Sequence, residues 1–136
     1  MRESSDKNLI GDIGSCELAY LGDAACEILT RQRLVAGGIH GAGNLNKEAL
    51  RFVTAVAQSE AIERILPVLT EKEIEIYKRG RNQHGASIPR SASAAQYRRA
   101  TGFEALLGYL WIAGEHERLK YLFSVAYPED QEEKSV

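Results

Sequence analysis

Two short stretches determine how this chain is interpreted: Leu18-Ala-Tyr-Leu-Gly-Asp-Ala24 and Phe103-Glu-Ala-Leu-Leu-Gly-Tyr-Leu110. Each has one acidic residue, Asp23 or Glu104, among apolar and small residues, and we expect both stretches to be buried helix. An ionised carboxylate taken out of water costs several kcal/mol unless a positive group compensates it. Two such acids, far apart in the sequence, suggest one shared partner, and a hard divalent cation with oxygen ligands is the first candidate.

Small residues surround both acids, notably Gly22 and Gly108. They leave room for two helices to pack closely, and a crossing at this point would bring Asp23 and Glu104 together. Two bare carboxylates in contact repel each other and raise one pKa. Mg²⁺ between them would keep both ionised. From these residues alone an alternative stays open, in which each acid pairs with an arginine or accepts a backbone hydrogen bond.

The rest of the chain is also predicted to be helical, because no segment shows a sustained two-residue alternation rich in β-branched residues. The expected helices cover residues 15–35, 44 or 46 to 66, 70–80, 94–113 and 115–126. Thr70 and Glu73 have the capping-box spacing for the third helix. Residues 80–93, with several glycines and serines, are expected to form a loop.

Length and composition indicate one ordinary globular domain. The chain has 136 residues, 44% hydrophobic and 26% charged, with a net charge of −2, and we expect a single all-α domain over residues 1–136. Its core is expected over about 15–127, with a frayed acidic tail over 128–136. No apolar run is long enough to span a membrane, and no hydrophobic signal region precedes the first helix, so secretion is not expected.

The two cysteines are expected to be reduced. Cys16 and Cys26 lie ten residues apart on one predicted helix, about 15 Å apart, which is too far for a disulfide. Reduced thiols favour the cytoplasm, with an organellar stroma as the alternative. The sequence has no HExxH motif, no P-loop and no Glu-x-x-His pair, and we expect His40, His84 and His116 to be surface residues.

Three segments in order resemble the Mini-ribonuclease III family: Leu18-Ala-Tyr-Leu-Gly-Asp-Ala24, Lys78-Arg-Gly-Arg-Asn82 and Tyr97-Arg-Arg-Ala-Thr-Gly-Phe-Glu-Ala-Leu-Leu-Gly-Tyr-Leu110. The likeness extends over roughly residues 18–127. It implies an all-α helical bundle like the ribonuclease III endonuclease domain, without the usual double-stranded-RNA-binding module. The resemblance further implies a homodimer that cuts structured double-stranded RNA with Mg²⁺.

The resemblance also assigns roles to residues. Asp23 and Glu104 match the metal-binding catalytic acids of ribonuclease III enzymes. The implied substrate is the precursor of large-subunit (23S) ribosomal RNA, cut to leave a 5′-phosphate and a 3′-hydroxyl. Full-length enzymes have further acids where this chain has Cys16, Ala19 and Thr101. The Mini branch shares the alanine and threonine type of change, so we expect waters or phosphate oxygens to complete the coordination of the cation.

Basic residues are concentrated between Glu75 and Glu104, where there is no acid. The candidates for phosphate contacts are Lys78, Arg79, Arg81, Asn82 and Arg98. Arg98 and Arg99 point to different sides of a helix, so at most one of them is expected to contact RNA, and the other to pair with an acid. We expect neither a small-molecule cofactor nor a membrane partner.

Two other functions are compatible with this sequence. One is a non-cleaving RNA-binding or ribosome-associated relative of the family, because acids are missing at positions 16, 19 and 101. The other is a helical interaction protein in which Asp23 and Glu104 form internal ion pairs.

Overall fold

The computed structural model describes residues 12–83 and 92–129, and all regular structure within these ranges is helical. The elements are α2 (Ser15–Ala36), α3 (Ala42–Val53), α4 (Ala55–Ile65), the 3-10 helix η1 (Leu66–Val68), α5 (Glu71–Arg81), α6 (Ala94–Ile112) and α7 (His116–Ala126). The all-α prediction is confirmed for these ranges, and α2, α5, α6 and α7 have boundaries close to the expected ones. None of the described helices is both long and apolar enough to cross a membrane. The tail over 130–136 and the middle of the expected loop, 84–91, lie outside the described residues.

The predicted long second helix is wrong, because the chain breaks it at Thr54. This residue has extended backbone angles, φ −73° and ψ 156°. Its hydroxyl oxygen accepts a hydrogen bond of 3.1 Å from the backbone N–H of Ala57 and so caps the start of α4. The apolar pattern continues on both sides of the break, so periodicity alone could not reveal it. The change of direction turns α4 across α6.

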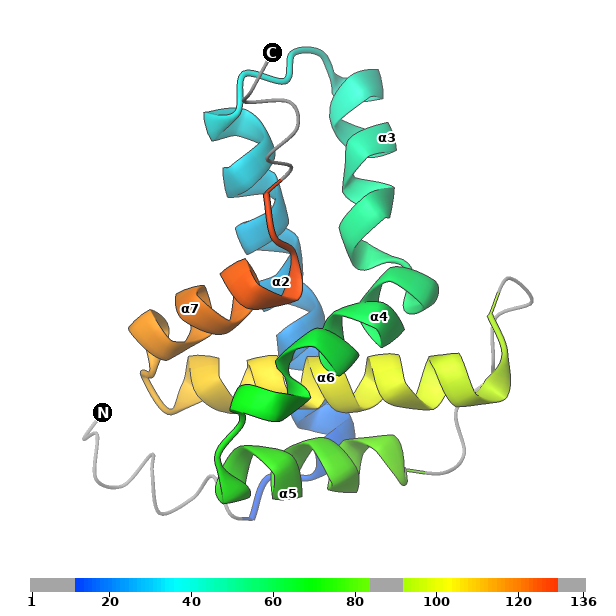
Figure 1. The fold of residues 1–136 in the computed structure, drawn as a ribbon, viewed down its shortest axis with the longest axis vertical. Helices are drawn as coiled ribbons and strands as arrows, with labels where there is room; N and C mark the ends of the chain where they lie inside the picture. The colour runs from blue at the N-terminus through cyan, green and yellow to red at the C-terminus, as the bar shows by residue number, and fades with distance from the viewer. Residues whose placement is uncertain (1–11, 84–91, 130–136) are drawn as a thin grey trace.

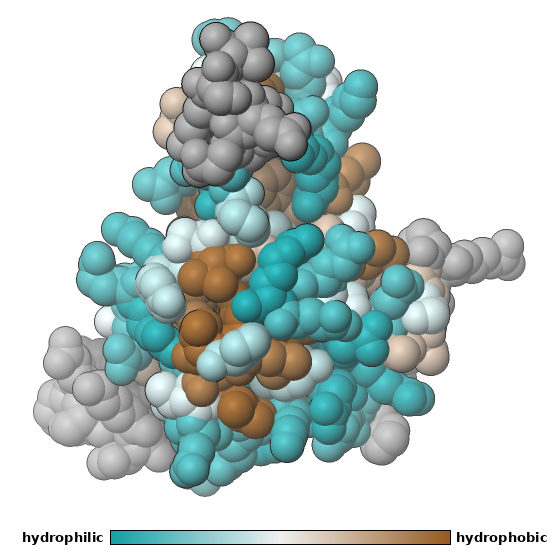
Figure 2. Space-filling model, viewed as in Figure 1, coloured by the Kyte–Doolittle hydropathy of each residue, from teal (hydrophilic) through white to brown (hydrophobic). Residues whose placement is uncertain are grey.

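Helix α6 lies at the centre of the fold, with α2, α4 and α5 packed against it (Figure 1). Phe103, Leu106 and Leu107 on α6 are 0% exposed. A helix covered on several sides needs apolar residues around most of its circumference, which explains the nearly continuous apolar sequence here. Helix α7 packs on α4, and hydrophobic side chains gather near these two helices on the face shown in Figure 2.

The crossing of α2 and α6 brings the two backbones into direct contact. A Cβ atom added at Gly22 would lie 1.6 Å from the carbonyl oxygen of Glu104, and one added at Gly108 would lie 1.9 Å from that of Leu18. No side chain fits at either position, so both glycines are required for this close approach. The predicted close packing at Gly22 and Gly108 is confirmed.

Helix α5 is tied to the rest of the fold at both ends. The predicted capping box is present, with Thr70 and Glu73 exchanging hydrogen bonds, and Glu73 also binds Arg118 of α7 at 2.8 Å. Burial disfavours the charged form of Glu73, but hydrogen bonds from Arg118 and Thr70 outweigh it and lower its pKa. At the other end Gly80 packs on Gly102 and Ala105 of α6.

Replacing Gly22 by alanine is expected to lower the free energy of unfolding by about 3 kcal/mol or more, because the added methyl group meets backbone that cannot rotate away. The matched control is Gly43→Ala in α3, where an added Cβ has nothing within 4 Å. That change is expected to stabilise the helix by up to about 1 kcal/mol. Urea unfolding measures both, and equal midpoints for wild type and Gly22→Ala would contradict the backbone contact.

Candidate metal-binding site

The two acids meet where α2 crosses α6. Asp23 follows Gly22, whose Cα faces the backbone of Glu104, and the Asp23 carboxylate lies close enough to that of Glu104 to raise its pKa. The proximity predicted from the sequence is therefore confirmed. Because the glycines fix the distance between the helices, the fold itself forces these carboxyl groups together.

The two carboxyl groups are not equally buried. Glu104 is half-buried, as expected for a residue of the central helix, but Asp23 is exposed in this chain. The expectation that Asp23 is buried is therefore wrong. Gly22 faces α6, and Asp23, one residue further round the helix, lies at the margin of the contact.

The environment of Glu104 favours its protonated form. Burial, the charge of Asp23 and the hydrogen bond with Asp23 raise the pKa of Glu104 to about 8, while a hydrogen bond from Gln58 acts in the opposite direction. Near neutral pH the pair therefore holds a proton unless a cation replaces it. The site thus fits a divalent cation, which would allow both carboxylates to be ionised.

The donor set narrows the kind of cation. In residues 12–83 and 92–129, no third histidine, cysteine, aspartate or glutamate joins the pair. The hydroxyl of Thr101 donates to the carbonyl of Tyr97 at 3.0 Å, and Glu27 pairs with Arg31 at 3.1 Å. Two carboxylates with space for water suit Mg²⁺, which keeps several waters when bound by proteins.

Sequence reasoning missed Gln58. Its side-chain amide nitrogen donates to Glu104 Oε2 at 3.3 Å and to the sulfur of Cys26 at 3.7 Å, and the residue is 2% exposed. The sequence contains one indication that Gln58 is buried. It lies one turn before Ile62 and two turns before Ile65, on the apolar stripe of its helix. A polar residue at a core position needs a buried partner.

The first basic residues lie at the end of a helix. Lys78, Arg79 and Arg81 belong to the last turn of α5, so Arg81 is helical although it was expected in the loop. Asn82 follows directly, accepting a hydrogen bond of 3.2 Å from Arg81. The Arg81 guanidinium lies over the ring of Tyr77, 5.6 Å from its centroid. Since Gly80 packs on Gly102 and Ala105, this basic helix end adjoins the segment of α6 that contains Glu104.

The two neighbouring arginines of α6 have different surroundings. Arg99 donates a 2.8 Å hydrogen bond to Ser59 and lies 3.8 Å from Glu63, whereas Arg98 is exposed. The expectation that they point to different sides of the helix, with one of them paired with an acid, is therefore confirmed, and Arg98 is the one directed to solvent. Of the three histidines, His40 and His116 are exposed as expected, and His84 lies outside the described residues.

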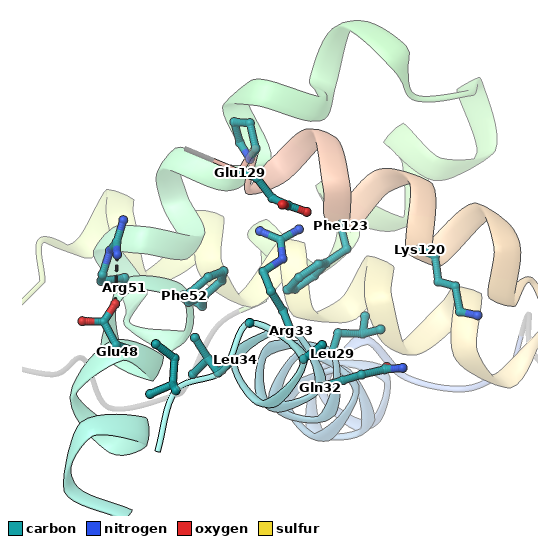
Figure 3. A pocket seen from close by; sticks show the side chains of 14 residues that line it. Leu29, Gln32, Arg33, Leu34, Glu48, Arg51, Phe52, Lys120, Phe123 and Glu129 are labelled. Carbon is teal, nitrogen blue, oxygen red and sulfur yellow. Dashed lines mark hydrogen bonds and ion pairs between the residues drawn. The ribbon is translucent and has the colours of Figure 1, made fainter. Parts of the chain in front are cut away.

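A separate cleft of about 630 Å³ lies between α2, α3 and α7 (Figure 3). Neither Asp23 nor Glu104 lines it. Its basic residues already have partners. Arg51 pairs with Glu48 at 2.9 Å, and the guanidinium of Arg33 donates to the carbonyl of Tyr127 and lies 4.9 Å from the ring centroid of Phe123. Because these arginines are already paired within the protein, the cleft gives no reason to place a ligand there. Asp23 and Glu104 remain the candidate site.

Comparison with known proteins agrees with the fold. The family model described as the ribonuclease III domain matches residues 17–115, which defines the class of protein. The Mini-ribonuclease 3 of Symbiobacterium thermophilum is 46% identical over 109 residues, covering 80% of this chain and 84% of that protein. The Mini-ribonuclease 3 of Streptococcus pneumoniae is 43% identical over 121 residues, covering 88% and 92%. The chain belongs to the Mini-ribonuclease III family.

A solved structure has the same fold. The crystal structure of a Fusobacterium nucleatum protein superimposes with a TM-score of 0.78 at 30% identity, covering 85% of this chain and 94% of that one. Together with the ribonuclease III domain match over residues 17–115, this likeness confirms the ribonuclease III-like architecture expected from the sequence.

The stability of the metal-free protein should fall as pH rises between about 4.5 and 8. The folded chain keeps the proton of Glu104, whose pKa is raised to about 8, whereas the unfolded chain has released it. The native state therefore binds more protons in this window, and unfolding becomes easier by at most about 1.4 kcal/mol per pH unit. Urea unfolding in EDTA at several pH values measures the slope. Glu104→Gln should flatten it, and an unchanged slope in this variant would contradict the assignment.

Proposed function

We propose that this chain is a Mg²⁺-dependent endoribonuclease that cleaves structured double-stranded RNA. The observation that carries the proposal is the contact between Asp23 and Glu104 at the crossing of α2 and α6. Residues 1–136 form a single catalytic domain in this proposal. Both cysteines of the chain are free, which suits a reducing compartment such as the cytoplasm.

In the proposed reaction Asp23 and Glu104 hold the cation. When bound, Mg²⁺ supplies a Lewis acid for the phosphodiester and lowers the pKa of the attacking water. The chain contributes two fixed negative charges, one exposed towards the substrate and one half-buried in the helix contact. The products are a 5′-phosphate and a 3′-hydroxyl.

The substrate-binding surface consists of Lys78, Arg79, Arg81, Asn82 and Arg98 in this proposal. Double-stranded RNA is recognised mainly through its shape, its phosphates and its 2′-hydroxyls. A basic helix end next to an acidic pair attracts phosphates that the carboxylates alone would repel. Large-subunit (23S) ribosomal RNA precursor is the substrate that the family resemblance suggests.

A homodimer accounts for the exposed apolar face of α2. Tyr20 is 84% exposed, Ile28 51% and Val35 64%, and Leu50 on α3 is 57% exposed. The three α2 residues follow helical spacing along one side of the helix, and this stripe adjoins Asp23. Two-fold pairing there would place two sites along one duplex, and sedimentation equilibrium showing a mass near the 15.0 kDa of one chain would contradict it.

A non-cleaving RNA-binding relative is the second candidate function. It is favoured by the small donor set, since only two acids come together in the described ranges. Under this reading the chain would bind duplex RNA but leave it uncut in Mg²⁺.

Asp23→Asn and Glu104→Gln are each expected to reduce the cleavage of a labelled RNA duplex by at least about a hundredfold. Losing a residue that only hydrogen-bonds to a metal ligand already lowers activity by about 10–100-fold, and losing the ligand itself should lower it further. Duplex binding in EDTA should persist, since both changes remove negative charge near phosphates. Thermal melting checks that the variants are folded.

The control for this pair is Glu27→Gln, which removes an acid one turn from Asp23 that is already paired with Arg31. It should leave cleavage within about twofold, since an exposed ion pair contributes little. Cleavage by the Asp23 or Glu104 variants at the wild-type rate would refute the proposed site, and duplex binding without cutting by the wild type would favour the second candidate.

Replacing Lys78, Arg79 and Arg81 together by alanine is expected to weaken duplex binding and to flatten its dependence on salt. Each lost phosphate contact lowers the slope of log K against log[salt] by about one. Lys72→Ala, at the first turn of the same helix, is the control because Lys72 pairs with Glu75. Filter binding over a range of salt concentrations measures the slopes, and identical slopes for the two variants would place the RNA elsewhere.

A further inference from the structure

Helix α4 places an uncharged polar side chain directly behind the acidic pair. Gln58 is 2% exposed, although glutamine is mostly found at protein surfaces. Burying an amide without hydrogen bonds costs about 1–3 kcal/mol. The position of Gln58 therefore depends on what its amide contacts.

The hydrogen bonds of Gln58 fix the orientation of its amide. Its nitrogen donates to Glu104 Oε2 at 3.3 Å and to Cys26 Sγ at 3.7 Å. Cys26 is 0% exposed and belongs to α2, so one amide links all three helices around the site. With a cation bound, Glu104 is ionised, and an ionised carboxylate accepts hydrogen bonds but donates none. The NH₂ group of Gln58, and not its carbonyl, must then face Glu104.

We propose that Gln58 is a positioning residue for the metal site, holding Glu104 Oε2 so that Oε1 is left to the cation beside Asp23. This inference rests on the proposed function. Hydrogen bonds from outer residues orient the carboxylates that bind metals and strengthen binding by about 10–100-fold. The effect matters more here than in a site with many ligands, because the described part of the chain brings only two carboxylates together.

The neighbouring residue provides a matched control. Ser59 is also on α4, is 3% exposed, and joins α4 to α6 by accepting a 2.8 Å hydrogen bond from Arg99. It does not contact the acidic pair. Ser59→Ala and Gln58→Met each remove one buried connection between the same two helices, but only the second removes a contact to Glu104.

The test compares wild type, Gln58→Met, Gln58→Asn and Ser59→Ala. Methionine keeps an unbranched side chain without a donor, and asparagine keeps the amide but is one methylene too short to reach Glu104. Binding of Mn²⁺ is followed by the electron paramagnetic resonance signal of the free ion, and single-turnover cleavage is measured over a range of Mg²⁺ concentrations. Circular dichroism and thermal melting report the fold.

Both Gln58 variants are expected to bind Mn²⁺ about tenfold more weakly and to need about tenfold more Mg²⁺ for half-maximal cleavage. Their affinity for duplex RNA in EDTA should be unchanged. Ser59→Ala should lower the melting temperature but leave both metal dependences within about twofold of wild type.

Equal metal dependences for the Gln58 variants and Ser59→Ala would overturn the positioning role and leave Gln58 a structural residue. If Gln58→Met does not fold, Gln58→Asn decides between the two outcomes. Wild type that neither binds Mn²⁺ more tightly than Asp23→Asn nor cuts RNA would refute the proposed function itself. That result is obtained without any Gln58 variant, so failure of the proposed function can be told apart from failure of the positioning role of Gln58.

Discussion

The contact between the backbones of α2 and α6 is the constraint on which the rest of the structure depends. At Gly22 and Gly108 there is no space for even one carbon atom between the two helices. The glycines weaken both helices slightly, because glycine loses more backbone entropy on folding than other residues. The close crossing offsets this by allowing α6 to be covered by α2, α4 and α5. The same crossing decides where the side chains next to the glycines must go.

Those side chains include two carboxyl groups that no sequence selected for stability alone would place together. Burial of Glu104 and the nearby charge of Asp23 raise the pKa of Glu104 to about 8. Local conflicts of this kind are typical of functional sites, where the surrounding fold maintains an arrangement that is unfavourable by itself. A divalent cation would turn the conflict into an attraction, and Gln58 then completes a site built from three helices rather than from a loop.

Much of this was predictable because it follows from local pattern. Apolar periodicity, glycine positions and the Thr70 capping box located most helices, and the small residues around Asp23 and Glu104 indicated that their helices cross. The break at Thr54 was not predictable from periodicity, since apolar residues continue through it. The exposure of Asp23 was also missed, because several faces of an apolar helix look alike until its packing partners are known. The place of Gln58 on an apolar stripe could have indicated its burial, but not its partner, because the contact with Glu104 joins residues 46 positions apart.

The central claim is that Asp23 and Glu104 hold one cation between them. Anomalous diffraction from crystals soaked in Mn²⁺ tests it most directly. The account predicts one peak within about 2.0–2.3 Å of a carboxylate oxygen from each residue. A well-occupied peak bound by only one of the two residues, or peaks only at other places on the chain, would contradict it.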